Sequence, residues 1–304
     1  MAWKGVHLTK PARLSLADGQ LVVEQDATVR IALEDIGWII IDDPRITLTS
    51  ALLSACMNAG IAMVVTDARH TPSGLALPFH THYRQAAVAA AQIGCSAPLK
   101  KRLWQSIVRA KINNQMGCLT VLGRDGAETV GTMAQRVGSG DPDNTEARAA
   151  RAYWSSLFNE FTRSDETDRR NKLLNYGYAV VRAGVARSLV AAGFLPCIGL
   201  HHASETNGFN LADDLFEPFR PFVDVAVFGI SGADKCASQE ITVEDRRALA
   251  GVLLCAATMG DEVMTLLTAT ETVAASLVRA IDNADPKLLA LPRVGAAETR
   301  ERAA

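Results

Sequence analysis

The period of the apolar residues changes once along this chain, near residue 80, and this change constrains the fold more than any other feature. Before it, short runs rich in Val and Ile follow one another, as in "ARLSLADGQLVVEQ" and "TVRIALEDIGWIIIDD". After it, apolar residues recur at helical spacing, as in "NTEARAARAYWSSLFNEF" and "DRRNKLLNYGYAVVRAGVARSLVAAG". The two periods predict a β region followed by an α region.

We therefore predict an α+β protein of two domains, a small and mostly β domain over residues 1–80 and a larger all-α domain over residues 81–304. The "ADGQ" stretch predicts a hairpin turn. In the first domain "LTSALLSACMNAG" predicts a single helix, with Thr49 or Ser50 as its N-cap and Gly60 as its end. The stretch "LALPFHTHYRQ" separates the two patterns.

The composition is that of a globular protein, and the formal net charge of −2 excludes a global basic field that would attract polyanions. A nucleic acid would have to be held by local basic patches. The six cysteines form no Cys-x-x-Cys pair, which favours reduced core residues. The longest apolar runs are too short to span a bilayer, so we expect a cytoplasmic protein without membrane contact.

Residues 201–221, "HHASETNGFNLADDLFEPFRP", place two histidines close to three acids. If a short helix starts with Asn210 as its cap, Asp213, Asp214 and Glu217 can share a face. A mixed set of His and carboxylates suits Mg²⁺ or Mn²⁺. The alternative interpretation is an ordinary solvated helix start, where acids suit the helix dipole. His201 and His202 point in different directions, so at most one serves a common centre.

A metal site of this kind needs a ligand from elsewhere in the fold, and Glu146 is the candidate. It follows Asn144, which we expect to cap the helix, and Arg148 and Arg151 lie near it in sequence. The alternative is that Glu146 is only a first-turn acid. Phosphate-loop, serine-elbow and zinc-site spacings are absent from the sequence.

These segments together resemble the CRISPR spacer-acquisition integrases, and most closely the subgroup found with type II systems. "LSLADGQLVVEQ" is similar to the family's β domain, and "AKINNQ" and "DNTEARAARAYWSSLF" to two of its helices. "LNYGYAVVRAGVARSLVAAGFLPCIGLHHASETNGFNLADDLFEPFRPFVD" resembles its central signature almost without a gap.

The resemblance implies metal ligands at Glu146, His202 and Glu217, with His202 chosen as the fourth residue of Gly199-Leu200-His201-His202. It further implies nearby residues that support the metal site, with Arg220 in the same signature: Asp214, Asn175, Tyr176 and Tyr178.

The implied activity is a Mg²⁺- or Mn²⁺-dependent DNA endonuclease and integrase. It would insert short double-stranded DNA fragments into a repeat array as new spacers, by attack of the fragment's 3′-hydroxyl on a phosphodiester. The implied assembly is a homodimer, with the N-terminal domain in dimerisation and partner contact. Two dimers would be bridged by a dimer of a small second adaptation protein into a heterohexamer, and the effector nuclease is a further expected partner.

DNA would be gripped by basic side chains, each of which is otherwise an ordinary solvated residue. The candidates are Lys100, Lys101, Arg102, Arg148, Arg151, Arg163, Arg169, Arg170 and Lys172. Two alternatives to the integrase remain at this point. One is a stand-alone structure-specific nuclease acting in DNA repair, and the other is a non-catalytic DNA-binding scaffold subunit.

Overall fold

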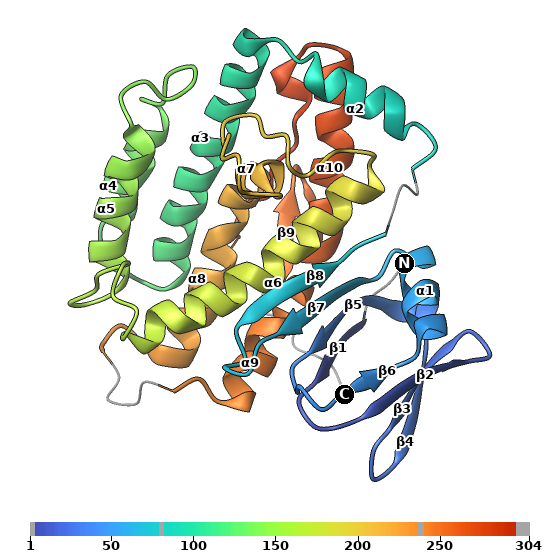
Figure 1. Ribbon diagram of the computed structural model, residues 1–304. Coiled ribbons are helices and arrows are strands. Elements are labelled where there is room, and N and C mark those ends of the chain that lie inside the picture. The colour runs from blue at the N-terminus through green and yellow to red at the C-terminus, as the bar shows by residue number, and fades with distance from the viewer. Residues whose placement is uncertain (1–3, 79–81, 236–239, 296–304) are drawn as a thin grey trace.

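The computed structural model describes residues 4–78, 82–235 and 240–295, and its elements run from strands to helices in chain order (Figure 1). The N-terminal elements are β1 (Lys4–Leu8), β2 (Arg13–Ala17), β3 (Gln20–Glu24), β4 (Thr28–Ala32), η1 (Leu33–Asp35), β5 (Ile36–Ile41), β6 (Thr47–Leu48), α1 (Ser50–Asn58), β7 (Ala62–Thr66) and β8 (Pro72–Ala76). From α2 (Gln85–Ile93) onwards helices dominate, which confirms the predicted α+β class.

Two four-stranded sheets build the N-terminal part. One has the order β1-β5-β7-β8, with the first three strands parallel and β8 antiparallel. The other has the order β4-β3-β2-β6. The predicted hairpin joins β2 to β3, and its turn residues Asp18 and Gly19 both have positive φ, 50° and 70°. Thr49 accepts the predicted N-cap bond of α1 from the amide of Leu52.

Strand β5 is buried along its whole length because both of its faces are covered. Ile36, Ile39 and Ile41 pack into a core shared by the two sheets and α1. Trp38 and Ile40 point to the other face and join the core of the helical part. The β part and the helical part therefore share apolar packing across one face of the first sheet.

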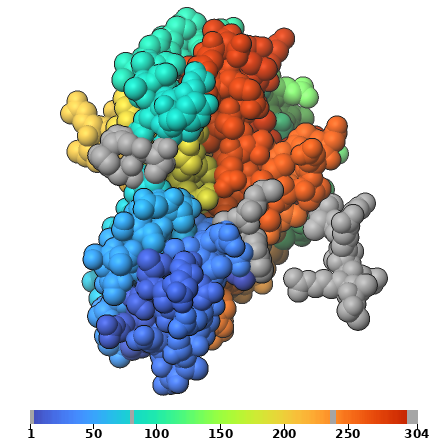
Figure 2. All heavy atoms as spheres, turned by 90° about the vertical axis from the view of Figure 1, so that its right-hand side faces the viewer, coloured from blue at the N-terminus to red at the C-terminus, as the bar shows by residue number. Residues whose placement is uncertain are grey.

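The helical part is built around α6 (Arg169–Ala191), which contacts α7, α8, α9 and α10 and also β7 and β8. The other elements are α3 (Ala97–Val121), α4 (Ala127–Ala134), α5 (Thr145–Leu157), α7 (Asn210–Phe216), η2 (Glu217–Phe219), α8 (Arg220–Ser231), α9 (Val243–Ala250), η3 (Gly251–Leu254), α10 (Leu266–Asp282) and η4 (Pro286–Leu288). From the side, α2 and α10 lie together above the N-terminal lobe (Figure 2).

The C-terminal region also contains two strands where the sequence predicted only helix. β9 (Ala256–Met259) and β10 (Glu262–Thr265) pair as an antiparallel hairpin. Its turn contains Gly260 at φ 61°, a conformation that glycine adopts without strain. The apolar run "GVLLCAATM" is thus divided between η3 and a strand. The sequence did not predict this, because a short apolar run does not distinguish helical from strand periodicity.

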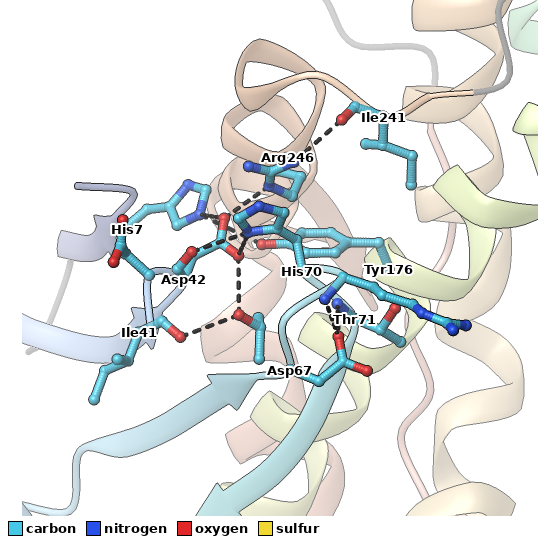
Figure 3. Close-up of polar contacts among 12 residues, drawn as sticks. His7, Ile41, Asp42, Asp67, His70, Thr71, Tyr176, Ile241 and Arg246 are labelled. Atoms are coloured by element: carbon cyan, nitrogen blue, oxygen red, sulfur yellow. Dashed lines mark hydrogen bonds and ion pairs between the residues drawn. The ribbon is translucent and has the colours of Figure 1, made fainter. Parts of the chain in front are cut away.

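A polar joint centred on Asp42 connects the β part to the helices (Figure 3). The buried carboxylate of Asp42 accepts hydrogen bonds from Thr66 and from Arg246 of α9, and it is bonded to the rings of His7 and His70. The Arg246 Nε lies 2.7 Å from an Asp42 oxygen. Beside this joint lies a cavity of about 620 Å³. The joint adds a directed ion pair to the shared apolar packing.

The sequence also led us to expect no membrane-spanning helix and reduced cysteines. No helix within the described residues is long and apolar enough to cross a membrane. Five of the six cysteines are described and carry free thiols, while Cys236 lies outside the described residues.

Candidate active site

Two carboxylates from separate helices meet at one ammonium group. Glu217 follows α7 directly and is only 4% exposed, and Glu146 lies in the first turn of α5. The Nζ of Lys111, from the middle of α3, lies 2.5 Å from Glu146 Oε1 and 2.5 Å from Glu217 Oε2. Glu146 and Glu217, two of the three predicted ligands, are therefore brought to one point although 71 residues separate them in sequence.

Arg220 holds the other oxygen of Glu217. Its Nε donates to Glu217 Oε1 at 2.9 Å, and its guanidinium lies over the rings of Phe216 and Tyr178 at 4.7 and 4.8 Å. Burial opposes ionisation of Glu217, but the charges of Lys111 and Arg220 outweigh it and lower the pKa of Glu217 to about 2. Glu217 is thus a carboxylate at neutral pH despite its burial.

Lys111 is held as a cation by the same two carboxylates. Burial favours its neutral form, but the charges of Glu217 and Glu146 outweigh burial and raise the pKa of Lys111. One turn further along α3, Asn114 donates to the backbone carbonyl of Pro218 at 2.7 Å. Helix α3 therefore fixes both the charge and the backbone of the Glu217 segment.

The buried acid Asp224 supports this arrangement through two tyrosines. It accepts hydrogen bonds from the hydroxyls of Tyr178 and Tyr153 at 2.5 and 2.7 Å. Burial raises the pKa of Asp224 to about 6, and the two phenols oppose that rise. Tyr178, predicted to lie beside the site, is thereby fixed under Arg220 and acts on Glu217 through it.

His202 lies on a loop that closes around Asp214. The fully buried Asp214 carboxylate accepts the backbone amides of Leu200, His201 and His202, and it lies 2.7 Å from His202 Nδ1. A Cβ at Gly199 would lie 2.3 Å from the His202 carbonyl oxygen, so only glycine fits this turn. Asp214 therefore positions the histidine and its loop.

The two histidines have different surroundings, as expected. The ring of His201 stacks on Trp104 at 4.2 Å between centroids. The side chain of His202 is 42% exposed, and its hydrogen bond to Asp214 raises its pKa against the effect of burial. With a proton on Nδ1 shared with Asp214, the Nε2 lone pair of His202 is free to bind a metal, the arrangement common in histidine ligands.

The donor set fits a hard divalent cation in part. Two carboxylates already converge on a cation, and Glu217 Oε2 is a buried atom that accepts no directed hydrogen bond from the described residues. The Glu217 charge also contributes to the raised pKa of His202. Within the three described ranges, however, no three His, Cys, Asp or Glu side chains form a ready metal cluster. The metal-ligand role of the three residues stays a prediction.

Two of the predicted helix caps, Asn144 and Asn210, do not cap through their side chains. Asn144 adopts a left-handed conformation and makes no capping bond, whereas the Asp141 carboxylate accepts the amides of Thr145 and Glu146 at 2.9 Å each. Asn210 is the first residue of α7, and its side chain instead bonds the carbonyls of residues 197 and 204. Asp141 thus presents Glu146, and Asn210 ties down the histidine loop.

The three acids of residues 213–217 do not act on a common centre. Asp213 pairs with Arg182 of α6 and with Asn207. Asp214 serves the His202 loop, and Glu217 serves Lys111 and Arg220. Each of the three acids therefore binds a different segment of the chain.

Tyr176 and Asn175, both expected near the site, make no contact with its carboxylates among the described residues. Tyr176 faces the polar joint, with its hydroxyl 3.4 Å from His7 Nε2. Asn175 is exposed and accepts a hydrogen bond from Arg163 at 2.7 Å. Successive residues of α6 point in different directions, so the "LNYGY" stretch divides between the joint and the active site.

Several basic residues predicted to contact DNA are free to do so. Exposed or half-buried on the first turns of α3 and on α5 are Lys100, Lys101, Arg102, Arg148 and Arg151. The amide of Gly140 donates to the Lys101 carbonyl at 3.0 Å, which brings the start of α3 against the turn that precedes Glu146. This basic surface therefore lies close to the carboxylates in the fold.

The prediction for Arg170 is wrong, because its side chain is fully buried. It pairs with Asp168 at 2.7 Å and donates to the carbonyls of Asn159 and Ala233. Arg169 pairs with Asp245 at 2.5 Å, and Arg163 bonds Asn171 and Asn175. These arginines organise loops around the start of α6, and the half-buried Lys172 follows them.

The sequence reasoning missed the supporting roles of Asp141, Asp224 and Trp104. An acid inside the apolar run "FRPFVDVAVFG" was the available signal for Asp224, because a buried carboxylate needs dedicated partners. Asp141 was hidden by Asn144, the more obvious cap three residues later, and the partner of Trp104 is brought to it only by the tertiary fold.

Comparison with known proteins gives a consistent result. Residues 6–258 match the model of the family described as "CRISPR associated protein Cas1". The CRISPR-associated endonuclease Cas1 of Neisseria meningitidis serogroup C is 37% identical over 297 residues, 97% of each chain. A casposase bound to its integration product has the same fold, with TM-score 0.74 and 17% identity over 93% of this chain and 91% of that one. A chain of a Cas6-RT-Cas1–Cas2 complex gives 0.72 and 18% identity over 97% of this chain and 36% of that one.

Proposed function

Since this chain belongs to the Cas1 family, we propose that it is the DNA endonuclease and integrase of CRISPR adaptation, which joins short DNA fragments to a repeat array as new spacers. The observation that carries the proposal is the convergence of Glu146 and Glu217 on one point. The Neisseria relative is named an endonuclease, which supports cleavage of DNA. The fold shared with a casposase agrees with joining as well as cutting.

Glu146, Glu217 and His202 would hold one Mg²⁺ or Mn²⁺ ion, with the neutral imidazole favouring Mn²⁺. When bound, such an ion supplies Lewis-acid stabilisation of the charge that develops on a reacting phosphate. Arg220 fixes one oxygen of Glu217 and leaves Oε2 directed to the centre. Asp214 sets the ring orientation of His202.

The reaction is a direct exchange of phosphodiester bonds. The 3′-hydroxyl oxygen of the incoming fragment forms a bond to a phosphorus atom of the repeat and loses its proton. The bond from that phosphorus to the 3′-oxygen of the repeat strand breaks, and this oxygen takes up a proton. Water in place of the fragment's hydroxyl gives hydrolysis, so the same site serves both nuclease and integrase activity.

The DNA would be held mainly by an assembly. A formal charge of −2 predicts weak DNA binding by a single subunit, even with the basic surface around Lys101 and Arg148. We propose a homodimer, two copies of which are bridged by a dimer of a small Cas2-type protein into a heterohexamer. The fold match to a chain in a Cas1–Cas2 complex supports that partner, and linking two sites multiplies weak contacts. The effector nuclease is a further proposed partner in choosing fragments.

The test is half-site integration of a short duplex into a supercoiled plasmid that carries a leader and repeat, with and without the small partner, in Mg²⁺ and Mn²⁺. We expect His202→Ala to lower fragment joining by more than about 100-fold, because even a partner of a metal ligand contributes 10–100-fold. His201→Ala is the matched control, since His201 stacks on Trp104 and bonds no acid through its ring. It should retain joining.

The outcomes separate the rival functions. DNA binding without cleavage or joining under any condition would favour the scaffold subunit. Metal-dependent cleavage of branched DNA without joining would favour the repair nuclease. Joining that survives His202→Ala and is lost in His201→Ala would retain the function and reassign the histidine.

A further inference from the structure

The ammonium of Lys111 occupies the place where a metal ion bound by Glu146 and Glu217 would have to lie. Its Nζ is 2.5 Å from an oxygen of Glu146 and 2.5 Å from an oxygen of Glu217. Its side chain is 11% exposed and that of Glu217 is 6% exposed, so little water reaches the contact between these two groups. An ammonium this close to both carboxylates fills the space at which an ion bridging them would lie.

The charges around this point balance only with Lys111 in place. Glu146 and Glu217 contribute two negative charges, and Lys111 and Arg220 contribute two positive ones. Arg220 packs over the Phe216 and Tyr178 rings, which hold its planar guanidinium. The ammonium of Lys111 is instead carried on a flexible four-carbon stem. It is therefore the cation that can move.

Lys111 bridges the two carboxylates. Its ammonium donates a hydrogen bond to Glu146 Oε1 and lies 2.5 Å from the buried Glu217 Oε2. A metal ion has no directional donors and can satisfy both oxygens together. A metal ion that approaches the Lys111 ammonium is repelled by it. This repulsion is several-fold stronger than that between two like charges at the surface, because water is largely excluded.

We propose that Lys111 is an internal counter-cation that neutralises Glu146 and Glu217 in the metal-free protein and competes with the divalent ion for them, so that metal binding must displace its ammonium. This inference rests on the proposed metal site and concerns how that site is filled. Lys111 thus stabilises the buried Glu217 and the half-buried Glu146 side by side before the metal arrives, and its displacement weakens metal affinity.

The first test compares Lys111→Met with the wild-type chain by thermal unfolding and by calorimetric titration with Mn²⁺, without DNA. Lys111→Met should lower the metal-free melting temperature by at least about 5 °C, because the buried Glu217 and the adjacent Glu146 lose their shared counter-charge. It should bind Mn²⁺ at least about tenfold more tightly, and Mn²⁺ should raise its melting temperature by more than it raises that of the wild type. Lys287→Met, at an exposed lysine of η4, is the matched control and should change neither quantity.

The second test needs no variant and covers the case in which Lys111→Met does not fold. Lysine acetylation of the wild-type protein is followed by mass spectrometry at rising Mn²⁺. The rate at Lys111 should rise in step with Mn²⁺ occupancy, while the rate at Lys287 stays constant.

The possible results are distinct. If the wild type binds Mn²⁺ but Lys111 stays protected and Lys111→Met binds no more tightly, the competition is wrong and the metal site stands. If neither protein binds Mn²⁺, the proposed metal site itself fails, and the inference fails with it.

Discussion

At the scale of single residues, Asp214 shows how one side chain can position a functional loop. Its two oxygens accept three consecutive backbone amides and lie within hydrogen-bond distance of His202 Nδ1. The carboxylate is fully buried, and within the described part of the chain these donors compensate for its lost hydration. Asp214 is therefore a positioning residue, and the ring orientation of His202 depends on it.

Asp214→Asn should lower fragment joining by about 10–100-fold while the protein remains folded, which is the usual loss when the partner of a metal ligand is removed. The amide replaces one acceptor oxygen with a donor, which faces backbone N–H groups that are donors themselves. The measurement is the joining rate in Mn²⁺ together with a circular dichroism spectrum.

The neighbouring acid provides the control for this change. Asp213→Asn removes a carboxylate that pairs with Arg182 and Asn207 and makes no contact with His202. Its joining rate should stay close to that of the wild type. Equal losses in the two variants would show that Asp214 acts through general stability and not through the histidine.

At the scale of elements, α6 links the two parts of the molecule. Its residues reach the polar joint through Tyr176, the Arg220 guanidinium through Tyr178, and Asp213 of α7 through Arg182. Gly177 lies between the two tyrosines at the closest approach of α6 to its neighbours. A Cβ there would lie 2.5 Å from Val223 and 3.3 Å from Leu249, which belong to α8 and α9.

Gly177→Ala should lower the free energy of unfolding by about 1–2 kcal/mol. The clash costs about 1–3 kcal/mol, and the better helix propensity of alanine returns less than about 1 kcal/mol. Gly229→Ala on α8 is the matched control, because a Cβ at that exposed glycine meets no atom within 4 Å. It should raise stability by up to about 1 kcal/mol. Urea unfolding of both variants measures the difference, and a stabilised Gly177→Ala would contradict the close packing.

At the scale of elements, the sequence predicted some features correctly and others wrongly. Periodicity predicted α1 and its Thr49 cap, and the β2–β3 hairpin, because these depend on neighbouring residues. The cap of α5 comes from Asp141 and not from the adjacent Asn144, because the chain folds back on itself before the helix. Resemblance to a family named Glu146 and Glu217, but only the fold could bring Lys111 between them.

At the scale of the whole molecule, the position of the β part relative to the helices depends on the Asp42 joint. The carboxylate of Asp42 is fully buried and bonded to three residues of the β part and to Arg246 of α9. Burial raises its pKa, but the bonds to His7, Arg246 and His70 outweigh this and hold the pKa below 3.8. The ionised form is therefore the one that connects the two parts.

Asp42→Asn should cost about 3 kcal/mol at pH 7, because it leaves the buried Arg246 without its partner. A lowered pKa gives a stability contribution that is complete above pH 3.8 and is lost as the pH falls through the folded-state value. The difference between wild type and variant, measured by urea unfolding, should therefore shrink below pH 3.8. Asp43→Asn removes an adjacent acid that pairs only with exposed Arg45 and should cost less. A difference that stays constant down to pH 3 would mean that the joint is held by shape and apolar packing, with the Asp42 charge playing no part.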